Sequence, residues 1–401
     1  MSDMAAAYAA DPHGIGARLR EAGPVHQVTM PDGTSVWLVT RYADVHRALA
    51  DPRLSLSKRN AKPGGYQGFS LPPALDANLL NMDAPDHTRL RRLAGPAFTA
   101  RRVAELRPAL TDAARGLADA VAARLAAEGS ADLVADFATP YAVLAISELL
   151  GVPAASRGRF REWTAGLLGA EATREGMAAI VREMYAFFTT LVADKRAQPS
   201  GDLLSDLVAA RDADDRLGED ELTSLAFLLL FAGYENSANL IAGAAYAALA
   251  DERVRAAARG DGIAALVEEV ARHESPALLA IRRFPVEDVE IGGAVVPAGE
   301  TVMLALATAN RDPRRFTAPD TVDLGRDDLH RHLSFGQGVH YCIGAPLARL
   351  EAEVALTALL DRLPDLRLSD EDPAVWHQSL RVRGLAALPV VGGEPARPGH
   401  R

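Results

Sequence analysis

The residues with the clearest chemical potential surround Cys342, the single cysteine of the 401-residue chain. It lies in the segment FGQGVHYCIG, residues 335–344, directly before a helix expected to begin near Pro346. The glycines of this segment let the backbone turn tightly and approach a flat ligand. A thiol just ahead of a helix N-terminus meets free N–H groups and the positive end of the helix dipole, which favour the thiolate. The segment can therefore present an anionic sulfur ligand to iron.

Two other interpretations of Cys342 are open at this point. A lone cysteine is commonly an inert apolar residue of the core. It could also be a nucleophile with His340 as its base, although side chains two residues apart in an extended loop need not meet, and no oxyanion-type motif is evident. One cysteine excludes an internal disulfide and a zinc site built from several thiolates.

A second group of polar residues interrupts a long apolar segment. Residues 220–250 predict one helix, and its apolar run from Leu225 to Gly233 is shorter than the ~20 residues that a membrane span requires. A buried core helix is therefore expected. Glu235, Asn236 and Asn239 are costly to bury without partners, so they predict a polar notch, or else a capping contact with a neighbouring helix.

Two helical pairs could bind or bridge charges. Glu269 and Arg272 are three residues apart and share a helix face, where an ion pair can form. His87 and Arg91 are four residues apart and could grip one carboxylate together. Each pair taken alone is more commonly an ordinary solvated surface pair.

The remaining chain supplies the elements that position these groups. Residues 24–50 predict two short strands around an Asp-Gly turn and then a helix, residues 55–82 a long lid or binding loop, and residues 87–272 helices almost throughout. Strands return at 286–307, a loop follows, and residues 345–363 predict an amphipathic helix. We expect a mainly α fold with small β-sheets (α+β), forming a single domain over 1–401 with flexible ends at 1–20 and 393–401.

Composition narrows the function classes. With 43 Lys+Arg against 53 Asp+Glu, the net charge is −10, which disfavours non-specific binding to nucleic acid. The N-terminal residues show neither a basic region nor a long apolar run of a signal peptide or anchor. We expect a cytoplasmic protein without nucleic-acid or membrane partners.

The cysteine segment resembles the haem-binding loop of the cytochrome P-450 family. The family pattern Phe-x-x-Gly-x-x-x-Cys-x-Gly is met at Phe335, Gly338, Cys342 and Gly344. The resemblance implies a P-450 fold in which haem b lies between a long distal helix and the helix that follows the cysteine loop. Cys342 would be the thiolate ligand of the iron, with Phe335, Gly336 and Gly344 beside the haem. The implied enzyme is a monooxygenase that uses dioxygen and two electrons to oxidise a small-molecule substrate.

The segment 232–237, AGYENS, resembles the oxygen-activation segment of the same family. Glu235 takes its acidic position, and Gly233 is expected to open the distal helix beside the iron. The usual threonine is replaced by Asn236, whose amide cannot act as an alcohol relay. Water, Ser237 or a substrate hydroxyl would then help to deliver protons, so Glu235, Asn236, Gly233 and Ser237 are the expected catalytic residues.

Two further stretches agree with the resemblance. His87, Arg91, Arg282 and His340 align with the ligands of the haem propionates. Glu269, Arg272 and Arg326 match a structural network that supports the fold and the haem loop.

Electrons are expected from separate proteins, because one cysteine cannot hold an iron–sulfur cluster and no segment is left for a flavin. The resemblance implies a ferredoxin or flavodoxin with its NAD(P)H reductase. We expect it to dock on a basic patch formed by Arg91, Arg92, Arg101, Arg102, Arg331 and Arg349.

By analogy with the family, the substrate is a mainly apolar natural product of secondary metabolism. Its pocket is expected to be walled by 55–82, 155–180, Leu225–Asn239, Pro276–Ile281 and Gln378–Leu380, with Leu228, Leu229, Leu278 and Leu279 prominent. Hydroxylation, epoxidation and oxidative coupling are all compatible with these residues. A haem-binding sensor or carrier and a haem-free cysteine hydrolase are the alternatives.

Overall fold

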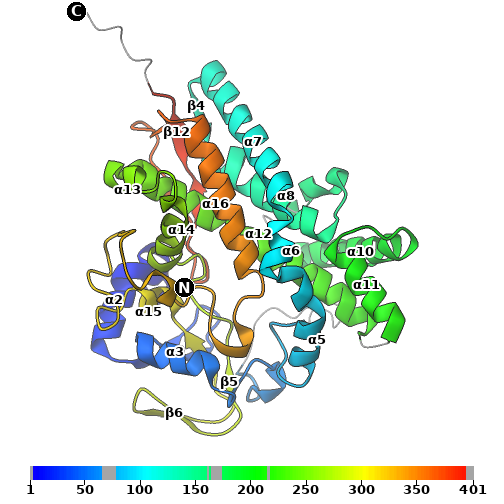
Figure 1. Cartoon of the computed structure of the whole chain (residues 1–401). Helices are drawn as coiled ribbons and strands as arrows, with labels where there is room; N and C mark the ends of the chain where they lie inside the picture. Colours follow the sequence, from blue (N-terminus) through cyan, green and yellow to red (C-terminus); the bar gives the residue numbers. More distant parts are fainter. Residues whose placement is uncertain (1–2, 66–77, 160–161, 164–173, 215–216, 394–401) are drawn as a thin grey trace, which may run out of the picture.

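The computed structural model describes residues 3–65, 78–159, 162–163, 174–214 and 217–393. Helices dominate these ranges, as predicted (Figure 1). The helices are α1 (Asp3–Ala10), α2 (Pro12–Ala22), α3 (Tyr42–Ala50), α5 (Asp86–Ala94), α6 (Ala100–Ala104), α7 (Arg107–Glu128), α8 (Thr139–Leu150), α10 (Arg174–Ala197), α11 (Leu203–Asp214), α12 (Glu219–Ala250), α13 (Glu252–Ala257), α14 (Gly262–His273), α15 (Leu306–Asn310) and α16 (Ala345–Arg362).

The strands are short and form small separate sheets. They are β1 (Val25–Thr29), β2 (Ser35–Val39), β3 (Leu54–Ser55), β4 (Ser130–Asp132), β5 (Phe284–Pro285), β6 (Val289–Ile291), β7 (Ala294–Val296), β8 (Val302–Leu304), β9 (Arg367–Leu368), β10 (Val375–Trp376), β11 (Leu385–Ala387) and β12 (Pro389–Val391). The strands expected near the N-terminus pair antiparallel, Val25 opposite Val39, and β8 adds to them in parallel. The turn between them uses Gly33 at φ +84°, a conformation that glycine adopts without strain.

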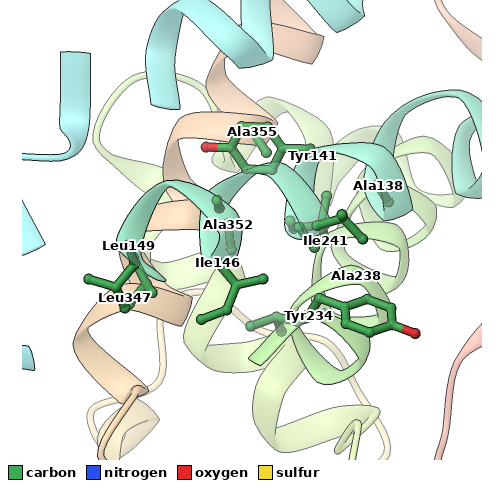
Figure 2. Packing of buried hydrophobic residues seen from close by; sticks show 14 of the residues in the cluster. Ala138, Tyr141, Ile146, Leu149, Tyr234, Ala238, Ile241, Leu347, Ala352 and Ala355 are labelled. Atoms are coloured by element: carbon green, nitrogen blue, oxygen red, sulfur yellow. The ribbon is translucent and has the colours of Figure 1, made fainter. Parts of the chain in front are cut away.

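The core lies where α8, α12 and α16 meet. Figure 2 shows Tyr141 and Ile146 of α8 beside Tyr234 and Ile241 of α12, with Ala352 of α16 close by. All of these side chains are buried. Burying such side chains stabilises the fold by roughly 1.5–3 kcal/mol for each large one, so the helices that carry the candidate site form a rigid scaffold.

The helix α12 is the predicted long core helix. The side chain of Glu221 accepts a hydrogen bond from the backbone N–H of Gly218 at 2.8 Å, which caps the helix at its start. By length and composition α12 could cross a membrane, but 71% of its most apolar window is buried inside the protein. The apolar residues of α12 therefore serve the core.

The N-terminal residues differ from our expectation of a flexible end at 1–20. They form α1 and α2, and Tyr8 and Ile15 pack with Leu278 and Ala307 in a small hydrophobic cluster. This contact removes apolar surface from water, which is why the segment is folded. Of the other expected flexible end, residues 394–401 lie outside the described residues.

The predicted pair of Glu269 and Arg272 is a buried ionic network. Arg272 has no exposed surface and donates to both carboxylate oxygens of Glu269, at 2.7 and 2.8 Å. Arg326 donates to the same carboxylate at 2.9 Å, and Arg272 also reaches the carbonyls of Asn310 and Pro319 at 3.0 and 2.8 Å. The network thus ties α14 to the loop that leads toward Cys342.

Candidate active site

The cysteine loop is a compact turn ahead of α16. Gly336 and Gly338 both have φ +74°, and a Cβ at Gly338 would lie 3.1 Å from Cα of Ala50. The backbone N–H of Cys342 donates to the carbonyl of Phe335 at 2.8 Å, which closes the loop. Glycine is therefore required in this turn for backbone conformation and for close approach to α3.

Cys342 has an exposed side chain although protein atoms crowd around it. This crowding raises the pKa of the thiol. Hydrogen bonds from the backbone N–H groups of Gly344 and Ala345 and the charges of Arg91 and Arg349 act in the opposite direction. The loop thus supplies the stabilising groups that a thiolate needs, and a coordinated metal ion would complete the deprotonation.

Basic side chains from three separate segments gather next to the loop. The rings of His87 on α5 and His340 lie with their centroids 4.0 Å apart. Arg91, one turn after His87, donates to the carbonyl of Tyr341 at 2.6 Å. The structure therefore brings together three of the four basic residues that the sequence assigned to the propionates.

Arg283, the neighbour of the predicted Arg282, also belongs to this cluster. Arg283 is 4% exposed, and its charge is among the causes that lower the pKa of His340. Arg282 donates to the side chain of Asn81 at 3.5 Å and stays a predicted ligand of the propionates. The isolated bridge between Arg283 and Val302 places neighbouring side chains on opposite faces of the extended chain, which the sequence alone did not reveal.

The electrostatics of this cluster favour an anion. Burial and the positive charges of His87, Arg283 and Arg91 lower the pKa of His340 to about 3. Nε2 of His87 and Nε of Arg283 are buried without a hydrogen-bond partner among the described residues. Buried donors of this kind demand an acceptor, so they fit the two carboxylates of haem b.

The distal residues lie on different faces of α12. Ala232 and Asn236, four residues apart, are exposed, whereas Tyr234 and Ser237 are buried. The helix runs without interruption through Gly233, which differs from the expected opening. A Cβ at Gly233 would lie 2.8 Å from the side chain of Ile146, so this glycine lets α8 and α12 approach closely.

Glu235 keeps the acidic position, with one charged neighbour. Burial raises the pKa of its carboxyl group, and the charge of Arg381 acts against this. Arg381 belongs to a turn that packs on α12, because a Cβ at Gly384 would lie 2.0 Å from the side chain of Asn239. The C-terminal turn therefore covers Asn239 of the predicted polar notch, whereas Asn236 is exposed.

Sequence reasoning missed Glu351, a buried carboxyl on α16. It is 1% exposed, and within the described parts of the chain neither of its oxygens has a hydrogen-bond partner of acceptable geometry. Burial raises its pKa to about 8, with a small opposing contribution from the hydroxyl of Ser237. Ser237 therefore faces an acid that holds its proton near neutral pH. An acidic residue within an apolar helical pattern was the available signal.

The thiol ahead of α16 and the buried basic cluster beside it fit a haem whose iron is bound by a thiolate. Comparisons with known proteins agree. Residues 263–373 match the model of the family described as Cytochrome P-450. The chain is 45% identical to the cytochrome P-450 monooxygenase PikC of Streptomyces venezuelae, over 96% of this chain and 91% of that one. It is 42% identical to the 6-deoxyerythronolide B hydroxylase of Saccharopolyspora erythraea, over 93% and 94% of the two chains.

A solved structure of a myxobacterial cytochrome P-450 in complex with myristic acid superposes with a TM-score of 0.89. It is 40% identical and covers 97% of this chain and 98% of that one. The chain belongs to the cytochrome P-450 family. It is a monooxygenase that uses haem b, and the predicted fold class is confirmed.

Proposed function

We propose that this monooxygenase oxidises a mainly apolar natural product in secondary metabolism. The observation that carries the proposal is the similarity, over nearly the whole chain, to natural-product enzymes such as a mycinamicin IV hydroxylase/epoxidase of Micromonospora griseorubida, 42% identical over 93% of this chain and 94% of that one. The exposed face of α12 supports it, because Ala232 offers a methyl group one turn before the amide of Asn236. A largely apolar substrate with one polar group would complement this face.

The pocket walls proposed from the sequence need one correction. Leu278 is fully buried against Tyr8 and Ile15, so it supports the N-terminal helices and does not face a substrate. Of the predicted walls, 66–77, 160–161 and 164–173 lie outside the described residues. The other described parts of the predicted walls, Leu225–Asn239 and the turn near Gln378–Leu380 among them, stay part of the proposal.

The cofactor and the chain divide the reaction between them. Haem b, when bound, activates dioxygen with two electrons so that one oxygen atom enters the substrate and the other leaves as water. Cys342 would hold the iron, and His87, Arg91, Arg283 and His340 would bind the carboxylates of the cofactor. Because these residues lie on packed elements, the protein presents them in fixed positions before the substrate binds.

Proton supply falls to the residues of α12 and α16. Glu351 keeps its proton near neutral pH, and the hydroxyl of Ser237 can accept and donate a proton. We propose that Glu351 and Ser237 supply the protons that Asn236, which stands in place of the usual threonine, cannot relay. Asn236 orients water or a substrate hydroxyl through its amide, and Glu235 exchanges protons with solvent beside Arg381.

The electron donor is proposed to be a separate ferredoxin or flavodoxin with its NAD(P)H reductase. Fewer arginines than expected are exposed in the basic patch that would bind this electron donor. Arg91 and Arg349 turn inward, to the carbonyl of Tyr341 and the carboxylate of Glu268, and Arg102 pairs with Glu105 at 2.9 Å. The exposed members of the patch are Arg92, Arg101 and Arg331. The cytoplasm stays the predicted location of the chain.

A spectral screen tests this proposal. Purified holoenzyme is titrated with macrolides, linear polyketides and fatty acids, and the substrate-induced shift of the haem Soret band is recorded. Hits are incubated with surrogate ferredoxin, reductase and NADPH, and the products are analysed by mass spectrometry. An oxygenated natural product formed in step with NADPH consumption supports the proposal. Spectral shifts and turnover with fatty acids alone would overturn the substrate class.

A further inference from the structure

A second buried carboxylate lies beside the Glu269 network. Glu268 is 3% exposed, and Arg349 of α16 donates to it through Nε at 2.5 Å and through a terminal nitrogen at 3.1 Å. His332 lies 3.1 Å from the same carboxylate, as does the more exposed His330. Glu268 therefore connects α14, α16 and the segment that enters the cysteine loop.

Arg349 contacts both arms of that loop. Its guanidinium carbon lies 4.5 Å from the centroid of the Phe335 ring, and a terminal nitrogen donates to the hydroxyl of Tyr341 at 3.2 Å. Phe335 accepts the backbone hydrogen bond of Cys342, and Tyr341 directly precedes Cys342. The position of Arg349 relative to the sulfur is thus fixed from three directions.

We propose that Arg349, held in place by Glu268, is a positioning residue that sets the reduction potential of the haem through its charge near the Cys342 sulfur. The added electron of the reduced haem is stabilised by a nearby cation and destabilised by a nearby anion. Arg349 favours the reduced form, and Glu268 offsets part of this effect. On this proposal Arg349 is not part of the docking patch, and it acts instead on the reduction of the haem.

The charges of this pair are permanent in the working pH range. Burial opposes ionisation of Glu268, but hydrogen bonds from His332 and Arg349 outweigh it and hold the pKa of this carboxyl far below its usual value. Burial likewise opposes the charge of Arg349, and its hydrogen bond to Glu268 raises the pKa again. The side chain of Arg349 is only 28% exposed, so salt screens its charge less than that of a surface arginine.

Redox titration of the holoenzyme tests the proposal with variants of opposite charge. Arg349→Gln is expected to make reduction about five- to tenfold less favourable, where tenfold corresponds to 59 mV for one electron. Glu268→Gln is expected to shift the potential in the opposite direction by a smaller factor. Arg349→Lys keeps the charge and should stay within about twofold of the wild type. Arg253→Gln, which removes an exposed arginine paired with Asp251, is the control for net charge.

The sign of the two shifts separates charge from structure. If Arg349→Gln and Glu268→Gln move the potential in the same direction, or if neither moves it, the proposal is wrong and the cluster only braces the loop. The position of the ferrous carbon-monoxide Soret band, recorded for each variant, reports whether the thiolate bond is intact. If Arg349→Gln does not retain haem, the reduction potentials of Glu268→Gln and Arg349→Lys test the proposal in its place. A higher potential in the first with a wild-type potential in the second supports the proposal, and any other result overturns it.

Discussion

Replacing Glu351 by glutamine should stabilise the fold by an amount that increases with pH. The carboxyl is 1% exposed, neither oxygen has a hydrogen-bond partner among the residues that the structure describes, and burial raises its pKa from 4.5 to about 8. Between these values the folded chain keeps the proton and the unfolded chain releases it, so a rise in pH favours unfolding. Each pH unit then costs the wild type about 1.4 kcal/mol. Glutamine does not titrate and avoids this cost.

The magnitude can be measured from two urea titrations. Holoenzyme and Glu351→Gln are unfolded at pH 5.5 and 7.5, and helix loss is followed by circular dichroism. The stability difference between the variants should grow by about 3 kcal/mol between these pH values. The exposed Glu371→Gln is the matched control and should show no such growth. A difference that is the same at both pH values would mean that Glu351 is ionised in the folded protein, which refutes the reasoning.

Four shorter predictions address the cofactor, the fold, the partner and proton supply. His87→Leu should raise the rate of haem transfer to apomyoglobin about tenfold, because a donor to the cofactor is lost; an unchanged rate contradicts this. Glu269→Ala leaves the buried Arg272 without its carboxylate partner and should lower the free energy of unfolding by about 3–5 kcal/mol. Thermal unfolding measures this change, and an unaltered midpoint would contradict the prediction. Arg101→Glu should raise the KM for ferredoxin several-fold and flatten its dependence on salt, while peroxide-driven turnover stays constant; if KM and salt dependence do not change, docking lies elsewhere. Asn236→Thr should keep the haem spectrum but change the product formed per NADPH, and equal coupling in both proteins argues against a role in proton supply.

The contiguous parts of the site could be predicted from the sequence. The loop around Cys342 is a short segment whose glycines and following helix are adjacent in the chain, so its chemistry needs no long-range information. The same holds for Glu269 with Arg272 and for His87 with Arg91, because helical spacing alone places each pair on one face. The helix 220–250 and the strands near the N-terminus follow from their periodicity.

The directions of individual side chains required the fold. Arg282 and Arg283 are neighbours, and only the fold shows that the charge of Arg283 acts on His340. The resemblance to the family predicts Arg91 and Arg349 on the surface that binds the electron donor. In the structure, a carbonyl and a buried carboxylate draw them inward.

The sequence by itself determined the fold class and the helices that carry the site, since local spacing encodes them, and its resemblance to the family singled out Cys342 as the proposed iron ligand. Only the tertiary structure decided that Ser237 faces Glu351, that Gly233 makes room for Ile146, and that Glu268 holds Arg349 beside the cysteine loop. Each of these contacts joins residues far apart in the chain. Their chemistry depends on burial and on which groups share a small volume, and these quantities exist only once the chain has folded.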